Sequence, residues 1–324
     1  MIINYPIAFH PILKQRIWGG EKLVSVFKKE SSEKGIGESW EISDVEGDVS
    51  VVANGPLQGK SLKALLREFK GDFVGHKNYD LFGDNFPILI KYIDAKTPLS
   101  IQVHPNNELA KQRHNSFGKN EMWYIMETDK NAELIIGFNQ KVNQEEYMEA
   151  LNNGDILEIL NTEKIAQGDT FYIPTGRVHA IGAGVVLAEI QQTSDVTYRI
   201  YDYKRVDAKT GLQRELHTHL ALDAIDYTVH DSYKTPYKLK ENESSKLVYA
   251  PYFKTNIIKL KGAIKKDYRA LDSFVIYMCV EGHARIKHNN TTYPLMLGAT
   301  VLLPASIKGV ELISDAAKIL EVYL

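Results

Sequence analysis

The sequence lacks the features that mark disulfide-rich, membrane-spanning and nucleic-acid-binding proteins. Cys279 is the only cysteine, so an intrachain disulfide and a zinc site built from cysteines are both excluded. No apolar run approaches the roughly 18 residues that a membrane-spanning helix needs. The first residues have neither the basic segment nor the cleavage site of a signal peptide. With 39 basic and 41 acidic side chains, we expect a cytoplasmic protein that has no nucleic-acid or membrane partner.

The composition is that of an ordinary globular protein. The chain has 324 residues, of which 44% are hydrophobic and 25% are charged. These proportions exclude the disordered and fibrous classes, and the length suits one large domain or two moderate ones.

Most segments of the sequence predict short β-strands. They are rich in Val, Ile, Thr and aromatic residues, and Gly, Pro, Asn or Asp bound many of them. Many short strands at such a spacing predict a mainly β sandwich or barrel. The predicted strands cover 88–92, 99–103, 122–126, 133–138, 170–173, 185–190, 197–201, 248–249, 253–260, 274–280, 284–288, 300–303 and 319–324.

Helical patterns are few. Residues 61–69 have apolar side chains at helical spacing after Ser61, a plausible N-cap. One short helix is expected over 106–114, and two over 143–161 with a break at Asn153-Gly154.

A polar segment over 226–246 is the best candidate for a domain boundary. We therefore expect a catalytic domain over 1–235 and a C-terminal β domain over 236–324.

An internal repeat connects the two parts of the chain. Residues 167–181 and 297–311 each contain a glycine six residues before a proline, with a β-rich run between them. The first copy has His179 five residues after its proline, where the second copy has Gly309. The repeat predicts two related β-modules, of which only the first is equipped for chemistry.

A second pair of segments extends this repeat. Glu121 opens the run EMWYIM, which we align with FVIYMC at 274–279, so that Phe274 falls opposite Glu121. The first copy is longer, and the helical segment 143–161 accounts for the difference as an insertion. The pattern G-D-x(4)-P-x(4)-H with an upstream His and Glu resembles the cupin superfamily. That resemblance implies two jelly-roll β-barrel modules with a few short helices inserted.

The clearest candidate metal ligands surround the run IQVHP at 101–105. Gln102 and His104 are two residues apart on a predicted strand, so their side chains point to the same face. Glu121 opens the next strong strand and His179 follows the strand–proline turn. Two imidazoles, a carboxylate and an amide oxygen suit Zn²⁺ and are compatible with other divalent metals.

These motifs and their order resemble type I mannose-6-phosphate isomerases, most closely the short bacterial form. The resemblance implies a zinc enzyme, with one zinc ion per chain, that interconverts mannose 6-phosphate and fructose 6-phosphate. The supporting segments are RIWGG (16–20), GESWEIS (37–43), VANGP (52–56), FPILIKYIDAKTPLSIQVHP (86–105), GKNEMWYI (118–125), IPTGRVHAIGAG (173–184) and QQTSDVTYRIYDY (191–203).

The resemblance also implies roles for individual residues. The family's zinc ligands fall on Gln102, His104, Glu121 and His179, of which the glutamine is the least essential. The family's active-site arginine and lysine fall on Arg199 and Lys119, and Ser100 precedes the QVHP motif as in the family.

The reaction that the resemblance implies passes through an enediol or enediolate. It needs an acid–base group near C1 and C2, positive charge near the oxygens, and a cation for the phosphate. Arginine suits a phosphate better than lysine because it binds with two parallel hydrogen bonds. We therefore expect Arg199 and Lys119 to bind substrate and take part in catalysis, and Ser100 and Trp18 to line the pocket.

The residue that transfers the proton is not fixed by the sequence. Glu38 and Glu41 are both candidates, and we favour Glu38. His104 or Glu121 acting from the metal site are alternatives.

Simpler structural roles also exist for several of these residues. Arg199 is then an ion-pair partner of Asp195 or Asp202, and Lys119 is a solvated charge. His217 and His219 share a face and are a candidate second pair, but they lie at an expected helix start, and we expect them to be structural or to lie outside the ligand set.

Two other functions fit part of the pattern. A cupin oxygenase would use two histidines and a carboxylate to bind Fe²⁺, although Gln102 would close a position that O₂ needs. A non-catalytic cupin would bind a sugar phosphate without turnover. For the isomerase the expected partner is a small sugar phosphate, and we expect the chain to be a monomer or a homodimer.

Overall fold

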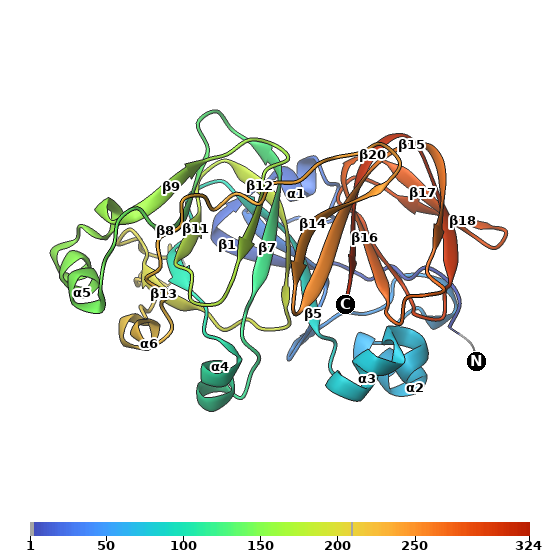
Figure 1. Ribbon diagram of the computed structural model, residues 1–324, viewed down its shortest axis with the longest axis horizontal. Helices are drawn as coiled ribbons and strands as arrows, with labels where there is room; N and C mark the ends of the chain where they lie inside the picture. Colours follow the sequence, from blue (N-terminus) through green and yellow to red (C-terminus); the bar gives the residue numbers. More distant parts are fainter. Residues whose placement is uncertain (1–2, 209) are drawn as a thin grey trace.

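Two β-rich modules lie side by side along the long axis of the molecule (Figure 1). The computed structural model describes residues 3–208 and 210–324. The first module contains two sheets. The six-stranded sheet has the order β1 (Ile12–Gly20), β2 (Ile36–Ile42), β5 (Ile88–Ala95), β12 (Val185–Gln192), β7 (Glu121–Thr128) and β10 (Thr170–Ile173). The five-stranded sheet has the order β13 (Tyr198–Tyr201), β6 (Ile101–Val103), β11 (His179–Ile181), β8 (Glu133–Phe138) and β9 (Leu160–Lys164).

The second module is a seven-stranded sheet that repeats the plan of the first. Its path β15-β20-β16-β19 has the same order as β5-β12-β7-β10. In the described residues, hydrogen bonding leaves these sheets open, so the expected cupin fold is confirmed but closed barrels are not formed. The strands are β14 (Ser244–Ala250), β15 (Phe253–Asp267), β16 (Val275–Gly282), β17 (Ala284–His288), β18 (Thr291–Leu295), β19 (Thr300–Leu303) and β20 (Gly309–Tyr323).

The register corrects one detail of the predicted repeat. Ile173 of β10 pairs with Glu121 of β7, whereas Leu303 of β19 pairs with Val275 of β16. Val275, not Phe274, therefore occupies the place of Glu121. A shift of one residue reverses the face of a strand, and Val275 accordingly faces the interior of the second module while Phe274 faces the first module.

A shared apolar core joins the modules. The six-stranded sheet packs one face on the interior of the first module and the other on strands of the second module and on α2 (Leu62–Val74). All eight residues of β5 and all eight of β12 are buried as a result. Strands covered on both faces read as continuous apolar runs rather than alternating ones, which explains the pattern of residues 88–95.

The helices predicted over 61–69 and 106–114 and the first of the two predicted over 143–161 are present with small changes in length, whereas the second is only a three-residue 3-10 helix before strand β9. Ser61 caps α2 by accepting a hydrogen bond from the backbone nitrogen of Ala64, and Asn143 and Glu146 form a capping box on α5. Gly154 ends α5 with a left-handed φ of 87°, which glycine adopts without strain. The remaining helices and short elements are α1 (Lys22–Ser25), β3 (Asp44–Val45), β4 (Asp48–Val49), η1 (Gly55–Leu57), α3 (His76–Phe82), α4 (Asn107–His114), α5 (Gln144–Asn153), η2 (Ile156–Glu158) and α6 (Thr218–Leu222).

The chain crosses between the modules more than once. Near the N-terminus, Ile7 and Leu302 exchange two backbone hydrogen bonds of 2.8 Å, and Lys29 donates to the carbonyl of Gly298 at 2.8 Å. The division into 1–235 and 236–324 stays a prediction. No helix in residues 3–208 or 210–324 is long and apolar enough to cross a membrane.

The shared core makes a prediction about stability. Phe274 is fully buried between the modules, with its ring 4.8 Å from that of Phe86. Phe274→Ala should lower the free energy of unfolding by about 3–5 kcal/mol, because it removes a large buried ring and leaves a cavity. Leu81→Ala is the control, since Leu81 is 74% exposed and its loss should cost under ~0.5 kcal/mol. Equal effects in chemical denaturation would contradict the shared core.

Candidate active site

Three potential metal ligands converge inside the first module. His104 directly follows β6, Glu121 opens β7 and His179 opens β11, and all three are at most 1% exposed. The Nε2 atoms of His104 and His179 lie 3.5 and 3.4 Å from the carboxylate oxygens of Glu121. One ligand atom from each residue lies within 4.8 Å of the others, a separation that suits a single ion.

Backbone carbonyls orient both imidazoles toward Glu121. Nδ1 of His104 lies 3.0 Å from the carbonyl oxygen of Val196, and Nδ1 of His179 lies 2.8 Å from that of Arg177. A carbonyl only accepts, so each Nδ1 carries the proton and each Nε2 presents a lone pair. This second set of contacts is typical of histidines that bind metals.

The polar atoms of this cluster also fit a bound cation. Nε2 of His104 and both carboxylate oxygens of Glu121 are buried, and no hydrogen-bond partner for them exists in the described part of the chain. Such unsatisfied buried groups are costly. Burial lowers the pKa of His179 to about 4 and that of His104 well below its usual range. Both imidazoles are therefore neutral at pH 7, as metal ligands must be.

The pKa of Glu121 also supports a cation site. Burial, together with the charge of Glu189, raises the pKa of Glu121 to about 8. A divalent cation would reverse this shift by stabilising the carboxylate. Two neutral imidazoles and one carboxylate form a nitrogen–oxygen donor set for a divalent metal.

Gln102 and Lys119 connect this cluster to a cavity. The side-chain amide of Gln102 lies 3.2 Å from Nε2 of His179, and Nζ of Lys119 lies 3.5 Å from Glu121. Lys119 is only 5% exposed, so it is not a solvated charge. A cavity of about 560 Å³ adjoins both residues. It also holds most other residues that the sequence singled out, namely Trp18, Glu38, Ser100 and Arg199.

Arg199 lies on the strand next to Gln102. Strand β6 runs between β11 and β13, and Gln102 pairs with His179 on one side and Arg199 on the other. The Nε of Arg199 donates to the Ser100 hydroxyl at 3.3 Å, and its Nη1 donates to the Glu215 carbonyl at 2.8 Å.

The alternative role of Arg199, an ion pair with Asp195 or Asp202, does not occur among the described residues, since Asp202 binds Arg205 and Arg214 instead. His217 braces the backbone of Arg199 through hydrogen bonds of 2.7 and 3.1 Å. His217 thus supports the arginine, and the Arg199 guanidinium contacts no carboxylate in residues 3–208 and 210–324.

The two candidate glutamates of β2 face opposite sides of the strand. Glu38 lines the cavity, where it accepts two hydrogen bonds from Arg16 at 3.0 and 3.1 Å and one from Trp40 at 2.6 Å. Burial raises the pKa of Glu38, but Lys91 and Arg16 outweigh it and lower the pKa to about 2. Glu41 points the other way, 2.7 Å from Nζ of Lys29, and is absent from the cavity wall.

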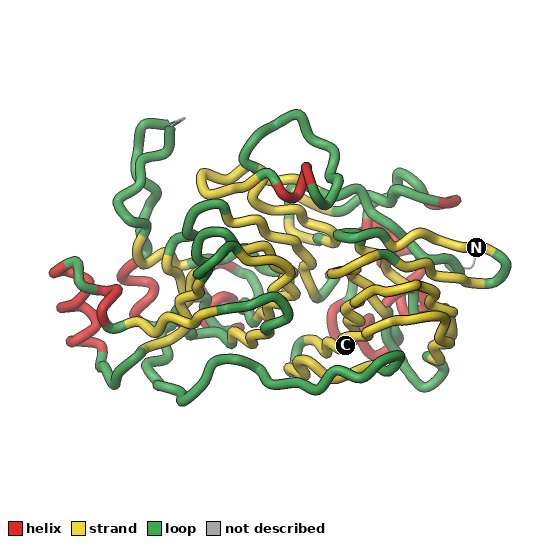
Figure 2. Tube along the Cα trace, turned by 90° about the horizontal axis from the view of Figure 1, so that it is seen from above, coloured by secondary structure: helices red, strands yellow, loops and turns green. Residues whose placement is uncertain are grey.

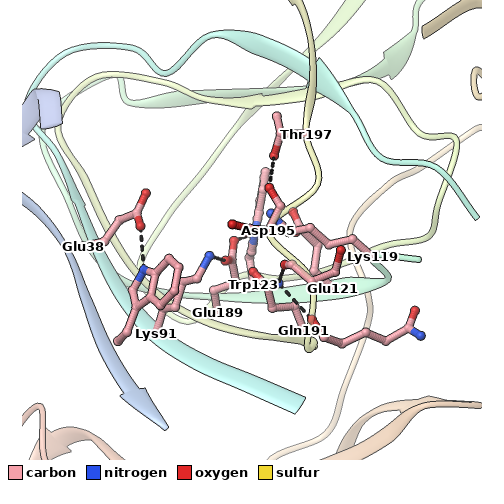
Figure 3. A network of polar contacts seen from close by, with 12 residues as sticks. Glu38, Lys91, Lys119, Glu121, Trp123, Glu189, Gln191, Asp195 and Thr197 are labelled. Carbon is pink, nitrogen blue, oxygen red and sulfur yellow. Dashed lines mark hydrogen bonds and ion pairs between the residues drawn. The ribbon is translucent and has the colours of Figure 1, made fainter. Parts of the chain in front are cut away.

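A buried ion pair in the cavity was not predicted (Figure 3). Nζ of Lys91 lies 3.2 Å from Glu189, which also accepts a hydrogen bond from Trp123 at 2.9 Å. Both charged residues line the cavity. A charged residue inside a fully buried strand indicates a functional site. Lys91, in the run ILIKYIDA, is such a residue and could have been singled out on this ground.

The chain was compared with known proteins. A family model described as phosphomannose isomerase type I, catalytic domain, matches residues 7–143. A second, described as mannose-6-phosphate isomerase, cupin domain, matches residues 243–324. A mannose-6-phosphate isomerase of Bacillus subtilis, ManA, is 36% identical over 307 residues, which cover 92% of this chain and 93% of that protein. The enzyme of the same name from Streptococcus mutans is 33% identical and covers 96% of both.

Solved structures agree with these matches. The crystal structure of the mannose 6-phosphate isomerase from Bacillus subtilis superimposes with a TM-score of 0.89 at 33% identity, covering 98% of this chain and 99% of that one. The phosphomannose isomerase of Salmonella typhimurium, at 16% identity and a TM-score of 0.79, shares the fold.

The cluster predicts how metal content responds to mutation. His104→Ala and His179→Ala should each lose most of the bound divalent metal, because each removes one of three donors. Gln102→Ala should retain more metal than either. His114→Ala is the matched control, since His114 contacts Tyr198 rather than the cluster. Elemental analysis of the purified variants measures the metal bound per chain. Wild-type metal content in both histidine variants would exclude this site.

Proposed function

The chain belongs to the type I phosphomannose isomerase family, and on that premise we propose that this isomerase interconverts mannose 6-phosphate and fructose 6-phosphate with zinc as its metal. One observation carries the proposal. A buried, unsatisfied His–Glu–His cluster adjoins a cavity through Gln102 and Lys119, and that cavity holds an arginine, Arg199, bound only to a hydroxyl and a carbonyl.

Zinc suits the donors. We propose that His104, Glu121 and His179 hold it, with Gln102 as a fourth ligand once its amide turns its oxygen inward. Bound zinc would supply Lewis-acid polarisation of the sugar oxygens without redox chemistry. The mixed nitrogen and oxygen donors support zinc.

The residues at the metal side of the cavity suit the proton transfer. The reaction moves a proton between C1 and C2 through an enediol or enediolate. Lys119 faces the cavity beside Glu121, so its ammonium group can donate to the oxygen on which negative charge develops.

Two carboxylates face the cavity in this scheme. Glu38 is held by Arg16 and Trp40 with a pKa of about 2, which makes it a weak base and favours a positioning role. Glu189 is held in the same way by Lys91 and Trp123. Burial raises its pKa, but Lys91 and Lys119 outweigh burial and lower it, so Glu189 is ionised and is also a weaker base than a free glutamate.

Another part of the cavity wall suits the phosphate. Arg199 and Ser100 offer a guanidinium and a hydroxyl side by side, and a guanidinium binds a phosphate with parallel hydrogen bonds. Trp18, 4% exposed, forms part of the cavity wall. The substrate would then lie with its phosphate at Arg199 and its reacting carbons toward Lys119.

The reaction itself can be tested directly. Formation of fructose 6-phosphate from mannose 6-phosphate should be abolished by a chelator and restored by Zn²⁺. The assay couples the product to NADPH formation, with each metal added back separately. No turnover by folded, zinc-loaded protein would leave a sugar-phosphate-binding protein, and oxygen consumption with Fe²⁺ would indicate an oxygenase instead.

A substitution separates substrate binding from metal binding. Arg199→Ala should keep the wild-type zinc content and lower kcat/KM by at least ~100-fold, because it removes the charge that faces the substrate. His217→Ala is a useful comparison, since it loosens the backbone of Arg199 and should have a smaller effect. Turnover within a few-fold of wild type would remove Arg199 from the active site.

A further inference from the structure

A second arginine reaches the cavity from a loop that the sequence motifs did not single out. The loop that follows β13 projects outward from the first module (Figure 2), and its two sides meet at a bridge between Val206 and Gln213. Arg214 follows that bridge and lines the same cavity as Arg199. We propose that Arg214 is a second phosphate-binding residue, which works with Arg199 to select phosphorylated over unphosphorylated sugars. This inference rests on the proposed function.

Two of the three guanidinium nitrogens of Arg214 bind Asp202, which leaves the third available for a ligand. Its Nε and Nη2 donate to the two oxygens of Asp202 at 2.8 and 2.6 Å. Its Nη1 has no recorded hydrogen bond among the residues that the structure describes. Asp202 is buried, at 5% exposure, so it fixes the guanidinium in place while the remaining nitrogen is free to bind a ligand. Preorganised donors of this kind bind anions without a further loss of side-chain freedom.

Asp202 is shared, which leaves positive charge uncompensated. The same carboxylate binds Arg205, whose Nη1 also donates to the carbonyl of Pro98. Three guanidinium groups, those of Arg199, Arg205 and Arg214, thus stand around one carboxylate. The two arginines that bind Asp202 carry one more charge than it neutralises, and Arg199 adds a third positive charge nearby, while Asp195 and Asp207 are carboxylates on the same cavity wall.

Repulsion between the arginines supports this assignment. Burial, followed by the positive charge of Arg214, lowers the pKa of Arg199, and Asp202 only partly offsets this. Two like charges near one another repel, and an anion bound between them would offset this repulsive energy. The acids on this stretch of the wall are engaged or exposed, since Asp207 accepts from the backbone of Thr210 and Asp195 lies open to solvent.

Arg205 provides a matched control for Arg214. It contributes to the same Asp202 ion pair, but it turns to the Pro98 carbonyl and is absent from the cavity wall. A substitution of either arginine removes one charge beside Asp202, together with two hydrogen bonds for Arg214 and one for Arg205. Only Arg214→Gln removes a nitrogen that faces the substrate.

The experiment measures steady-state kinetics and phosphate binding together. Arg214→Gln should raise KM for mannose 6-phosphate by about 10- to 100-fold with kcat within ~3-fold, as loss of a charge-assisted contact predicts. It should weaken competitive inhibition by inorganic phosphate by a similar factor. Arg214→Lys should recover part of both, and Arg205→Gln should leave KM within ~3-fold of wild type.

The outcomes are distinct. Unchanged KM and unchanged phosphate inhibition in Arg214→Gln would overturn the inference, as would an equal effect of Arg205→Gln, which would assign the change to Asp202 and its loop. Calorimetric titration with inorganic phosphate needs no turnover. Wild-type protein that binds phosphate through Arg214 without isomerising mannose 6-phosphate would therefore refute the proposed function and keep this inference.

Discussion

The buried carboxylate of Glu121 is the constraint on which the rest of the site depends. It is fully buried, and its oxygens find only the ring nitrogens of His104 and His179 and the ammonium of Lys119 nearby. A carboxylate in such a position is expensive unless a cation compensates it. The surrounding structure follows from that requirement, because burial keeps the imidazoles neutral and backbone carbonyls turn their lone pairs inward.

No described residue of the second module lines the cavity. Its strands cover the back of the sheet that carries Glu121. At the place equivalent to Glu121 it has Val275, and at the place equivalent to His179 it has Gly309. The repeat thus kept its strand order in both copies, while the second copy replaced its polar positions by residues that pack or turn.

The sequence predicted those features of the structure that depend on residues close together in the chain. Strands at 133–138 and 170–173 and the metal cluster followed from periodicity and spacing. Helix α3 was missed because none of its residues is buried, so it has no apolar stripe. The sequence did not single out Lys91, which lies in a strand buried on both faces, or Arg214, which lies in a polar loop. Both residues act through contacts between segments that are distant in the sequence, and local sequence patterns do not show such contacts.

The charges along the cavity explain why one sugar phosphate fits it in one direction. Along the middle of the wall, opposite charges are paired: Lys14 with Asp48, Arg16 with Glu38, and Lys91 with Glu189. Paired charges of this kind attract no ion strongly. Among the described residues, compensation is incomplete at Glu121, which needs a cation, and at the arginines that share Asp202, which can take an anion. A molecule with oxygens for a metal at one end and a phosphate at the other would satisfy both places, whereas the reverse orientation would place the phosphate beside Glu121.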